Sequence, residues 1–522
     1  MQSAIIALFS VLCLTFALRG TYRFLVPSGL APSGDAVVHL IIIDGIRRNG
    51  HHIPDQFPEL LLSGPHNYPS FFHWMLSFIP KKALEKWEPF IGTLIEMIHN
   101  AFIFGAVYYL ALGQGMTNPA WAGFIASLIF ALTPLLVDHV GRVFLLSERP
   151  FGSFLGTVFV FSALEYVVSS DLRFLATAAM TAGFIFISSK FAIQAIVFIS
   201  FVFSLLSWSI KIWLPIGAGL LIISFISRGY ALKLLIGHLK HSIFYRTFLL
   251  KHYLRPTSQY LDLLNSFVKG FRNPFFLLQA FRNNSLLKVF SMMPWTIVLF
   301  AALWKGGLPW KTNVLLHSSL LWIISSIMVL CITSLNPMRF LGEPERYLEA
   351  AILPVAFLTS FFLFERHSSI LWTFFIAVVI YAFSMVLIIF SDARHNKLWN
   401  SDQEELVEWL RKIKTSRILT IPLKAVCFLV YRTQHQGLSI LTNISEESQQ
   451  KRFRELCPIL YPLPNANLER LAKDYNLDII IAHRPTIDRL SSSGLGIRYD
   501  FSRFQIRYEN RSFVVYGVGE NL

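Results

Sequence analysis

Long apolar runs separated by short polar segments make up roughly the first three quarters of the chain. A helix that crosses a membrane needs about 20 mostly apolar residues, and the runs near this length predict about eleven membrane-spanning helices. These runs cover residues 2–26, 90–112, 117–139, 146–168, 172–188, 190–208, 211–228, 286–304, 312–334, 346–364 and 369–391. The two runs that flank Lys190 are also compatible with re-entrant or partly buried helices.

The pattern changes at about residue 392, where short apolar runs alternate with amphipathic ones. Residues 402–413 predict a helix that begins after the N-cap Ser401 and has acidic residues in its first turn. Further elements are predicted as strands over 417–421 and 425–430, a helix over 468–475, a strand over 477–482 and a hairpin over 504–518. This alternation predicts a small α/β domain over residues 392–522.

The polar segments between the runs indicate on which side of the membrane each loop lies. With the N-terminus inside, the short inner loops carry an excess of basic residues, and the C-terminal domain lies outside. The outer loops are then 27–89, 139–146, 229–285 and 335–346. Loop 229–285 is basic too, but the charge rule holds mainly for short loops. Its mixture of basic, aromatic and helically spaced apolar residues predicts amphipathic helices in the head-group layer.

The composition narrows the class of protein. The chain is 54% hydrophobic and 15% charged, whereas a soluble domain has roughly a quarter of its residues charged, so residues 1–391 are expected to form an α-helical, polytopic membrane domain. The net charge of +15 favours anionic membrane lipids or a phosphate-bearing substrate as partners, not nucleic acid. Gly494 and Gly496 do not open a helix after a strand, so no nucleotide-binding glycine motif is present.

The first outer loop holds the most informative polar residues. Residues 35–48 predict a short helix that ends at the stop signal Asn49-Gly50. Its apolar positions, which would let it lie along a membrane surface, are Val37, Val38, Ile41, Ile42 and Ile46. Asp35 and His39 share one face of this helix because they are four residues apart. Asp35 is a candidate general base or a ligand of a divalent cation, and the alternative is a helix N-cap.

The same loop supplies several candidates for contact with a substrate, which are His39, Arg47, His51, Tyr68 and His73. A zinc site would need tighter and more regular spacing of the histidines, so no metal site is predicted from them. In the second outer loop, Asp138 and Glu148 are expected to join Asp35 in catalysis, around one divalent cation such as Mg or Mn or in positioning an acceptor.

Basic residues near the later loops are candidates for binding phosphate. Arg142 and Arg149 offer planar guanidinium groups suited to bidentate contact, although salt bridges to Asp138 and Glu148 are the alternative. Lys190 interrupts an apolar region and either snorkels to the membrane surface or faces a polar cavity. In the third outer loop, Arg346 is the first candidate for a lipid phosphate and Arg339 the second, and Glu345 is expected to contact the substrate as well.

Together these features resemble the GT-C superfamily of polytopic glycosyltransferases, which includes protein mannosyltransferases, aminoarabinose transferases and oligosaccharyltransferase catalytic subunits. The resemblance covers residues 1–391 and rests on the acidic first loop at Asp35, the acidic second loop from Asp138 to Glu148, the long outer loop and Arg346 beside a span. The chain departs from the pattern in two respects, because it has no clear DxD motif and no WWDYG-like motif of oligosaccharyltransferases.

The resemblance implies a glycosyltransferase that uses a polyprenyl-phosphate sugar, with Asp35 in the place of the family's catalytic carboxylate. The missing motifs favour metal-independent, inverting transfer over protein N-glycosylation. The acceptor would be a glycan, a glycolipid or a protein outside a bacterial inner membrane. A transporter or flippase of a lipid-linked saccharide would show internal repeats and polar residues at mid-span, and neither is evident. A non-catalytic envelope assembly protein is the third hypothesis.

Overall fold

The computed structural model describes residues 2–25, 35–62, 64–138, 146–252, 259–306, 313–365, 368–395, 401–439, 443–492 and 496–519. The chain divides into two compact units, each of which collects segments that are far apart in the sequence. The helical unit comprises Met1–Val26, Lys86–Leu232 and Thr257–His395. The α/β unit comprises Pro27–Glu85, Lys233–Pro256 and Asn396–Leu522, so parts of the first and long loops belong with the C-terminal residues.

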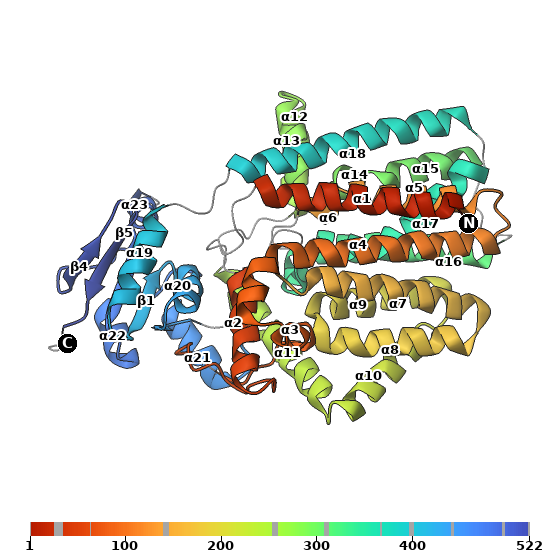
Figure 1. The fold of residues 1–522 in the computed structure, drawn as a ribbon. Helices are drawn as coiled ribbons and strands as arrows, with labels where there is room; N and C mark the ends of the chain where they lie inside the picture. The colour runs from red at the N-terminus through yellow and green to blue at the C-terminus, as the bar shows by residue number, and fades with distance from the viewer. Residues whose placement is uncertain are drawn as a thin grey trace. The chain divides into compact units, whose positions relative to one another are not determined.

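The helical unit contains long apolar helices that run roughly parallel to one another (Figure 1). Its described elements are α1 (Gln2–Leu25), α4 (Lys81–Gly113), α5 (Pro119–Leu132), α6 (Leu135–Asp138), α7 (Arg149–Ser169), α8 (Leu172–Ser188), α9 (Lys190–Ser207), α10 (Trp213–Ile226), α12 (Gln259–Gly270), α13 (Phe275–Asn283), α14 (Lys288–Ser291), α15 (Trp295–Gly306), α16 (Val314–Thr333), η3 (Asn336–Leu341), η4 (Pro344–Ala351), α17 (Ile352–Glu365) and α18 (Ser369–His395). The first residues of α4 belong to the α/β unit.

Each predicted apolar run contains a helix, but the predicted count of about eleven spans is not confirmed. Within the described residues, seven helices are long and apolar enough to cross a membrane, and the pair α10 and α11 (Tyr230–Thr247) adds an eighth if it is one broken span. Helices α5, α8 and α15 are apolar but shorter. Helix α5 ends at Leu132, two residues before Pro134, because a helix rarely continues into a proline.

Large apolar side chains from α5, α15, α16, α17 and α18 form the core of the helical unit. Some polar groups inside it form hydrogen bonds between elements, which offsets part of the cost of burying them. Trp295 donates from its indole N–H to the Thr133 hydroxyl at 2.8 Å. Asn100 of α4 donates to the Thr15 hydroxyl of α1 at 2.7 Å. Such hydrogen bonds satisfy polar groups that would otherwise be buried among apolar side chains and lipid without a partner.

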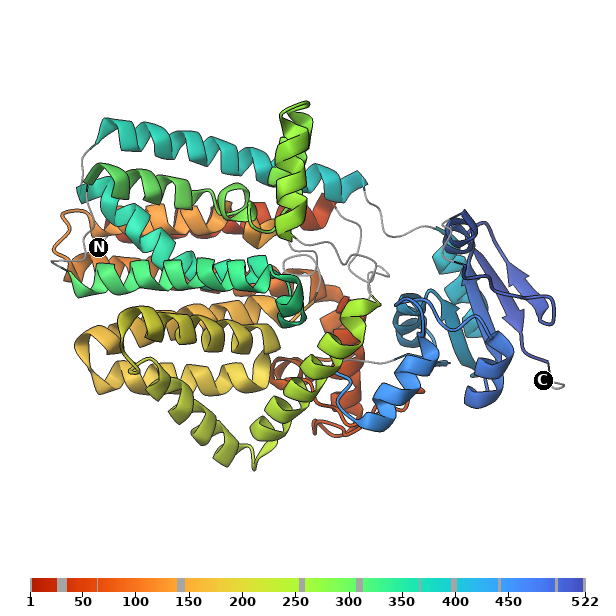
Figure 2. The ribbon, with the colours of Figure 1, turned by 180° about the vertical axis from the view of Figure 1, so that it is seen from behind.

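The α/β unit is built around a five-stranded mixed sheet in the order β2-β1-β3-β5-β4. Figure 2 shows strands of this sheet in blue, the colour of the C-terminal part of the chain. Its elements are α2 (Asp35–Arg48), α3 (Phe71–Ser77), most of α11, η1 (Leu249–Lys251), α19 (Ser401–Lys412), β1 (Arg417–Ile421), η5 (Leu423–Ala425), α20 (Val426–Arg432), β2 (Gln436–Gly437), α21 (Glu447–Leu456), α22 (Leu468–Tyr475), β3 (Ile479–His483), α23 (Arg484–Ser492), β4 (Gln505–Glu509) and β5 (Phe513–Gly517). Strands β1, β2 and β3 are parallel, whereas β5 is antiparallel to β3 and β4.

Apolar layers cover both faces of this sheet because successive strand residues point in opposite directions. Ile479 and Ile481 of β3 pack with residues of α2, α19 and α20. Ile480, between them, packs with residues of α11, α21 and α22 on the other face. The near-continuous apolar strands predicted from the sequence are therefore buried on both sides.

Most predicted elements after residue 400 are confirmed, namely α19, β1, α22, β3 and the hairpin of β4 and β5. The predicted strand over 425–430 is wrong, because these residues belong to the end of η5 and to α20. A short apolar run does not distinguish a buried strand from a buried helix, and Val426, Phe428 and Leu429 are all buried.

Helix α2 has the predicted bounds but not the predicted surroundings. Val37, Ile41, Ile42 and Ile46 are buried at 0–3% exposure, in one cluster with apolar residues of α19, α20 and the sheet. These side chains therefore pack against protein and do not supply the lipid contact from which the place of α2 along a membrane surface was predicted. Packing against the C-terminal residues shields the same apolar face from water.

Candidate functional site

Helix α2 places the first group of candidate residues. It begins at Asp35, as predicted, and has Arg47 and Arg48 in its last turn, where cations interact favourably with the helix dipole. Gly50 and His51 then adopt positive φ angles of 62° and 63°, which ends the helix. The side chain of Asp35 lies outside the described residues, so its candidacy as base rests on its position at the helix N-terminus.

Three predicted substrate-binding residues of the first loop come together. His39 of α2 and His73 of α3 are both buried, and His39 Nδ1 lies 2.8 Å from His73 Nε2. Tyr68 is close by, with its ring centre 6.3 Å from that of His39 and 5.9 Å from that of His73. Burial, followed by the charge of His39, holds the pKa of His73 well below its usual value. The His73 imidazole is therefore uncharged at neutral pH. A neutral imidazole has one nitrogen that donates a hydrogen bond and one that accepts, so it can contribute to a hydrogen-bonding surface.

His66 adds a further buried imidazole to the α/β unit. Its Nε2 lies 2.7 Å from the Ser70 hydroxyl, and burial, followed by the charge of Lys233, lowers its pKa to about 3. His66 was not among the site residues predicted from the sequence. Its only signal was its position two residues before the Tyr68–Ser70 segment, which does not distinguish it from an ordinary loop histidine.

Arg47 and His51 mainly join α2 to the chain around the end of α3. The Arg47 guanidinium donates to the Asp44 carboxylate and to the backbone carbonyl oxygens of Ser77 and Ile79, the last at 2.7 Å. His51 Nδ1 lies 2.8 Å from the Ser77 hydroxyl, and its ring stacks on Phe78 at 4.3 Å. These contacts give both residues a structural role at the end of the helix.

The second outer loop is described only at its two ends. Helix α6 ends at Asp138, whose side chain is outside the described residues, as is all of Arg142. Glu148 precedes α7 and is 1% exposed. A carboxylate missed by the sequence analysis, Glu88 of α4, accepts the backbone N–H of Leu146 at 2.8 Å and fixes the returning loop. Its signal was an acidic residue just before an apolar run.

The helical unit contains a pocket lined by two of the predicted cations, Arg149 and Arg346, and a third, Lys190, lies near the same aromatic ring. The Arg346 guanidinium carbon lies 4.0 Å from the centre of the Phe191 ring, Lys190 Nζ 5.0 Å from it and the Arg149 guanidinium carbon 5.3 Å from it. Arg149 comes from α7, Lys190 and Phe191 from α9, and Arg346 from η4. Cations over an aromatic face are attracted by its quadrupole, so Phe191 holds these side chains in one place.

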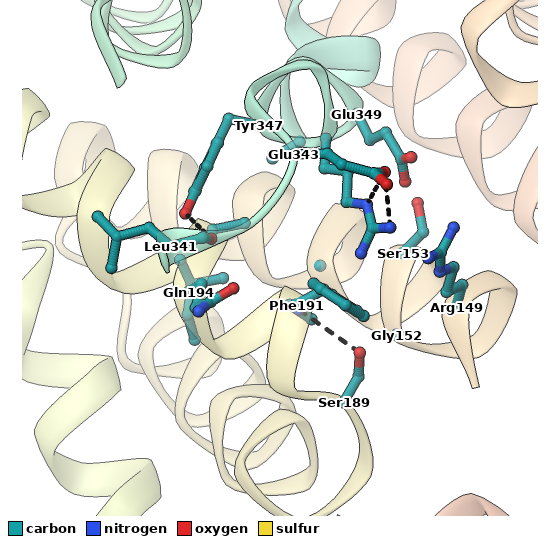
Figure 3. Close-up of a pocket in the computed structure, with 16 residues that line it drawn as sticks. Arg149, Gly152, Ser153, Ser189, Phe191, Gln194, Leu341, Glu343, Tyr347 and Glu349 are labelled. Carbon is teal, nitrogen blue, oxygen red and sulfur yellow. Dashed lines mark hydrogen bonds and ion pairs between the residues drawn. The ribbon is translucent and has the colours of Figure 1, made fainter. Parts of the chain in front are cut away.

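The wall of this pocket combines charged and apolar groups (Figure 3). The lining residues are Arg149, Gly152, Ser153, Gly156, Ser189, Phe191, Ala192, Gln194, Ala195, Ile196, Leu341, Glu343, Arg346, Tyr347, Glu349 and Ala350. Arg149, Phe191 and Glu343 turn toward one another in Figure 3. Gly152 faces Ser189 so closely that a Cβ would lie 2.6 Å from the Ser189 hydroxyl oxygen. Helices α7 and α9 therefore meet at the pocket floor only because residue 152 has no side chain.

In this structure the Glu343 carboxylate forms an ion pair with Arg346. Its Oε2 lies 2.6 Å from Nη2 and 2.7 Å from Nε of the arginine. The Arg346 side chain is 14% exposed, whereas that of Glu343 is 54% exposed. An exposed carboxylate can turn to water at small cost, and the arginine that it leaves would remain in the pocket. The arrangement suits a small anion attached to an apolar group, because the guanidinium groups sit among apolar walls.

The other candidates of the third loop make different contacts. Glu345 accepts from Lys288 Nζ of α14 at 2.6 Å, and both side chains are largely buried. Arg339 lies in η3 and is not among the residues that line the pocket. Three residues that line the pocket were not predicted as site residues from the sequence, namely Phe191, Gln194 and Glu343. An aromatic residue beside Lys190 is too common in an apolar helix to be a signal, and Phe191 gains its role only from residues far away in the sequence.

No family model matches the sequence, and no curated protein matches it. The structure is similar to solved structures of the oligosaccharyltransferase of Archaeoglobus fulgidus. One, AglB in complex with an inhibitory peptide and a dolichol-phosphate, gives a TM-score of 0.56 at 11% identity over 99% of this chain and 74% of that chain. Another, in complex with Zn and sulfate, gives 0.56 at 12% identity over 98% and 73%. A third, tethered to an acceptor peptide with an NVT sequon, gives 0.55 at 13% identity over 98% and 74%.

At these identities the likeness shows the fold. The chain has the fold of these solved structures, and the fold expected from the resemblance is confirmed at that level. The likeness also extends beyond the membrane region, since nearly the whole chain is covered. Together with the seven long apolar helices found among the described residues, this fold indicates an integral, multi-pass membrane protein.

Proposed function

We propose that this chain is a membrane glycosyltransferase that moves a sugar from a polyprenyl-phosphate donor to an acceptor outside the membrane. The observation that carries the proposal is the pocket in which Arg149 and Arg346 lie against Phe191 among apolar walls. The fold supports it, because the similar structures are oligosaccharyltransferases and one of them was solved with a dolichol-phosphate. The outer face of a bacterial inner membrane is the proposed location.

In this proposal the donor phosphate enters the pocket and takes the place of the Glu343 carboxylate on Arg346. The planar guanidinium groups of Arg346 and Arg149 bind the phosphate oxygens, and the polyprenyl chain stays in the lipid. Cations at the phosphate stabilise the charge that develops on the leaving group, which lowers the barrier to transfer. Lys190, beside the same ring, adds a third positive charge.

The reaction is a single displacement with inversion. The acceptor oxygen attacks the anomeric carbon, and the bond from that carbon to the phosphate oxygen breaks. The bonding electrons leave with the polyprenyl phosphate, and the proton of the acceptor goes to a carboxylate base. We assign this base to Asp35, with Asp138 and Glu148 as the other acidic candidates. His39, Tyr68 and His73 would contact the sugars through their shared hydrogen-bonding surface.

A divalent cation is a separate part of the proposal. Carboxylate oxygens are ligands that hard divalent cations prefer, and we propose that the buried carboxylate of Glu148 is a ligand of a Mg²⁺ or Mn²⁺ ion. Such an ion would add positive charge at the leaving phosphate. Chelation with EDTA, followed by return of either metal, tests this part by itself. If the rate of transfer is unchanged in EDTA, the reaction is independent of metal, as the resemblance implies.

The test is transfer from a panel of radiolabelled polyprenyl-phosphate sugars by purified membranes. Wild type is compared with Arg346→Ala and Asp35→Asn at equal protein levels. Arg173→Ala is the matched control, because Arg173 is an 89% exposed side chain paired with Asp171, outside the pocket. We expect one donor to be consumed by wild type and the control, and hundredfold less by each of the two variants, as about 10²–10³ is lost with one transition-state donor.

The outcomes separate the hypotheses. Equal consumption by wild type and Arg346→Ala would overturn the pocket as the donor site. Equal consumption by Asp35→Asn would make Asp35 a helix cap and move the base to Asp138. If no donor of the panel is consumed, the transferase proposal fails and a flippase assay in the same membranes becomes decisive.

A further inference from the structure

A second cleft lies within the α/β unit, with one wall from α2 and the opposite wall from α19, α20 and the residues around β2. Two adjoining cavities of about 450 Å³ and 500 Å³ form it. They are continuous, since six residues line both: Lys81, Thr415, Tyr431, Thr433, Gln434 and His435. These volumes lie in the range of small-molecule binding sites.

Interactions across its base hold the cleft in shape. The Tyr431 hydroxyl donates to the Glu85 carboxylate at 2.7 Å. Lys81 Nζ lies 4.7 Å from the centre of the Tyr431 ring and 2.6 Å from Asp44 Oδ2. His435 is also fixed, because its Nδ1 accepts the Ser416 backbone N–H at 2.9 Å and its Nε2 is 2.9 Å from the Leu410 carbonyl oxygen. Side chains from separate segments are thus ordered around one space.

The charges that line the cleft are mainly positive. Five lining residues are basic and two are acidic, and they are Lys81, Arg47, Arg48, Arg411, Arg432, Asp44 and Glu59. Both acids are already paired, Asp44 with Arg47 and Lys81, and Glu59 with Arg48. In the part of the chain that the structure describes, Arg411 has no acidic partner, and its Nε donates to the Arg432 carbonyl oxygen at 3.0 Å. Its terminal nitrogens remain available for an anion.

Uncharged hydrogen-bonding groups complete the lining. Thr415, Gln434 and Gln436 contribute hydroxyl and amide groups along the same wall, and Thr415 and Gln434 are exposed. Hydroxyl, amide and guanidinium groups are the partners that the hydroxyl-rich surface of a sugar requires, whereas an apolar ligand would leave them unpaired at a cost. The lining therefore favours a hydrophilic, negatively charged ligand.

An extended peptide does not fit this cleft by adding a strand to the sheet. Strand β2 is the edge nearest the cleft, but its edge is already occupied. The Gly437 N–H donates to the Glu59 carbonyl oxygen at 2.8 Å, and the Leu61 N–H donates to the Gly437 carbonyl oxygen at 2.9 Å. Strand addition needs free backbone groups on an edge, so a peptide would have to bind by side chains alone.

We propose that this cleft binds an anionic saccharide, one whose sugars carry carboxylate or phosphate groups. If the chain has the proposed function, the bound saccharide is the acceptor of transfer. Arg411 and Lys81 contact its charged groups, and the side chains of Thr415 and Gln434 contact its hydroxyl groups. The chain thereby selects a charged glycan instead of a neutral one.

The test is equilibrium binding of fluorescently labelled trigalacturonate to the purified full-length chain, with labelled maltotriose as the neutral probe. We expect trigalacturonate to bind and maltotriose to bind at least tenfold more weakly. Arg411→Glu should weaken trigalacturonate binding about tenfold or more, because charge-assisted hydrogen bonds are lost and replaced by repulsion. Arg489→Glu is the matched control, since Arg489 is exposed on α23, does not line the cleft and undergoes the same charge change.

Competition distinguishes the sources of the charge and the class of ligand. Stronger competition by galacturonate than by glucose 6-phosphate assigns a carboxylated saccharide, and the reverse assigns a phosphorylated one. Hexaglutamate that competes as well as trigalacturonate would overturn the proposal in favour of an acidic peptide. Equal binding of maltotriose, or full binding by Arg411→Glu, would overturn it as well.

The binding assay needs no donor, so its failure is separable from that of the proposed function. If donor is consumed but trigalacturonate and both anionic competitors do not bind, the cleft proposal fails alone. If trigalacturonate binds with the expected loss in Arg411→Glu but no donor is consumed, the cleft stands as a saccharide site and the transferase proposal fails.

Discussion

The guanidinium carbon of Arg346 lies 4.0 Å from the centre of the Phe191 ring, closer than that of Arg149 at 5.3 Å. Arg346 comes from the 3-10 helix η4, before α17, and Phe191 from the first turn of α9. Stacking engages the face of the guanidinium and leaves its N–H edge available for hydrogen bonds. The ring thus sets the position of the cation before a ligand arrives, which reduces the entropy lost on binding.

Phe191→Leu should weaken donor binding without abolishing transfer. The cation–π attraction contributes about 0.5–2 kcal/mol, so KM for the donor should rise between about 2-fold and 30-fold, with a much smaller change in kcat. The measurement is initial-rate kinetics in detergent. Phe201→Leu, at an exposed position of the same helix, should leave KM unchanged. A change confined to kcat would contradict the positioning role of the ring.

Glu343→Gln should not weaken donor binding, in contrast to Arg346→Ala. The substitution removes the carboxylate that holds Arg346 at 2.6 Å, so the guanidinium no longer has to exchange a charged partner for the phosphate. KM for the donor should stay equal or fall, whereas Arg346→Ala should lose transfer. A loss in Glu343→Gln as large as that in Arg346→Ala would show that the ion pair itself is the functional unit.

The loss of folding stability as the pH falls below neutral should depend on His73 and His66. Burial keeps the pKa of His73 well below its usual range and that of His66 at about 3, while an unfolded histidine titrates near pH 6.5. Below that pH the unfolded chain binds protons that the folded chain does not bind, so stability is complete above pH 6.5 and is lost as the pH falls. Each histidine contributes a slope of up to about 1.4 kcal/mol per pH unit.

Thermal unfolding of the detergent-solubilised chain between pH 7.5 and 5 measures this slope. His73→Gln should give a shallower fall of Tm with decreasing pH than wild type, whatever its Tm at pH 7.5. His52→Gln, at an exposed position of the same loop, should retain the wild-type slope. Parallel curves for wild type and His73→Gln would show that His73 gains its proton without cost in the folded state.

The sequence was informative where a feature depends on neighbours in the chain. Apolar runs and the stop signal at Asn49-Gly50 predicted the helices and the bounds of α2. The length of α5 was overestimated because the apolar pattern continues through Thr133 and Pro134, where the helix stops. The predicted strand over 425–430 was wrong because a short, continuous apolar run shows no periodicity that would distinguish a strand from a helix.

Features that depend on distant residues were not predictable from the chain alone. The apolar face of α2 was correctly identified, but an apolar face does not reveal whether lipid or protein covers it, and residues beyond 400 do so here. Likewise Arg149, Lys190 and Arg346 were candidates one by one, whereas Phe191, which brings them together, carried no signal. Candidates chosen by residue type therefore identified the cations and missed the ring.

Ile42→Ala should test the partnership between α2 and the C-terminal residues. Ile42 is 0% exposed in the cluster that includes Leu406 and Val407, and removing a buried isoleucine side chain costs about 2–5 kcal/mol. We expect a lower Tm for the α/β unit and earlier proteolysis after residue 400 in the full-length chain. Ile5→Ala, at a position 60% exposed, should change neither. Unchanged proteolysis in Ile42→Ala would mean that the C-terminal residues fold without α2.

Two glycines of α10 should respond in opposite directions to the same substitution. Gly219 packs on α8, and a Cβ there would overlap the Ala179 carbonyl oxygen and come within 2.8 Å of the Gly183 backbone nitrogen. Gly217 has nothing within 4 Å of its Cβ position. Small residues let helices in membranes approach closely, so Gly219→Ala must separate α8 from α10, and overpacking of this kind costs about 1–3 kcal/mol.

Gly217→Ala meets no such contact and relieves the helix of a residue that costs about 0.5–1 kcal/mol relative to alanine. We therefore expect the Tm in detergent to fall for Gly219→Ala and to stay equal or rise for Gly217→Ala. The comparison removes helix propensity as an explanation, since both variants gain the same methyl group on the same helix. Equal Tm values for the two variants would show that α8 and α10 are not held at the separation that Gly219 permits.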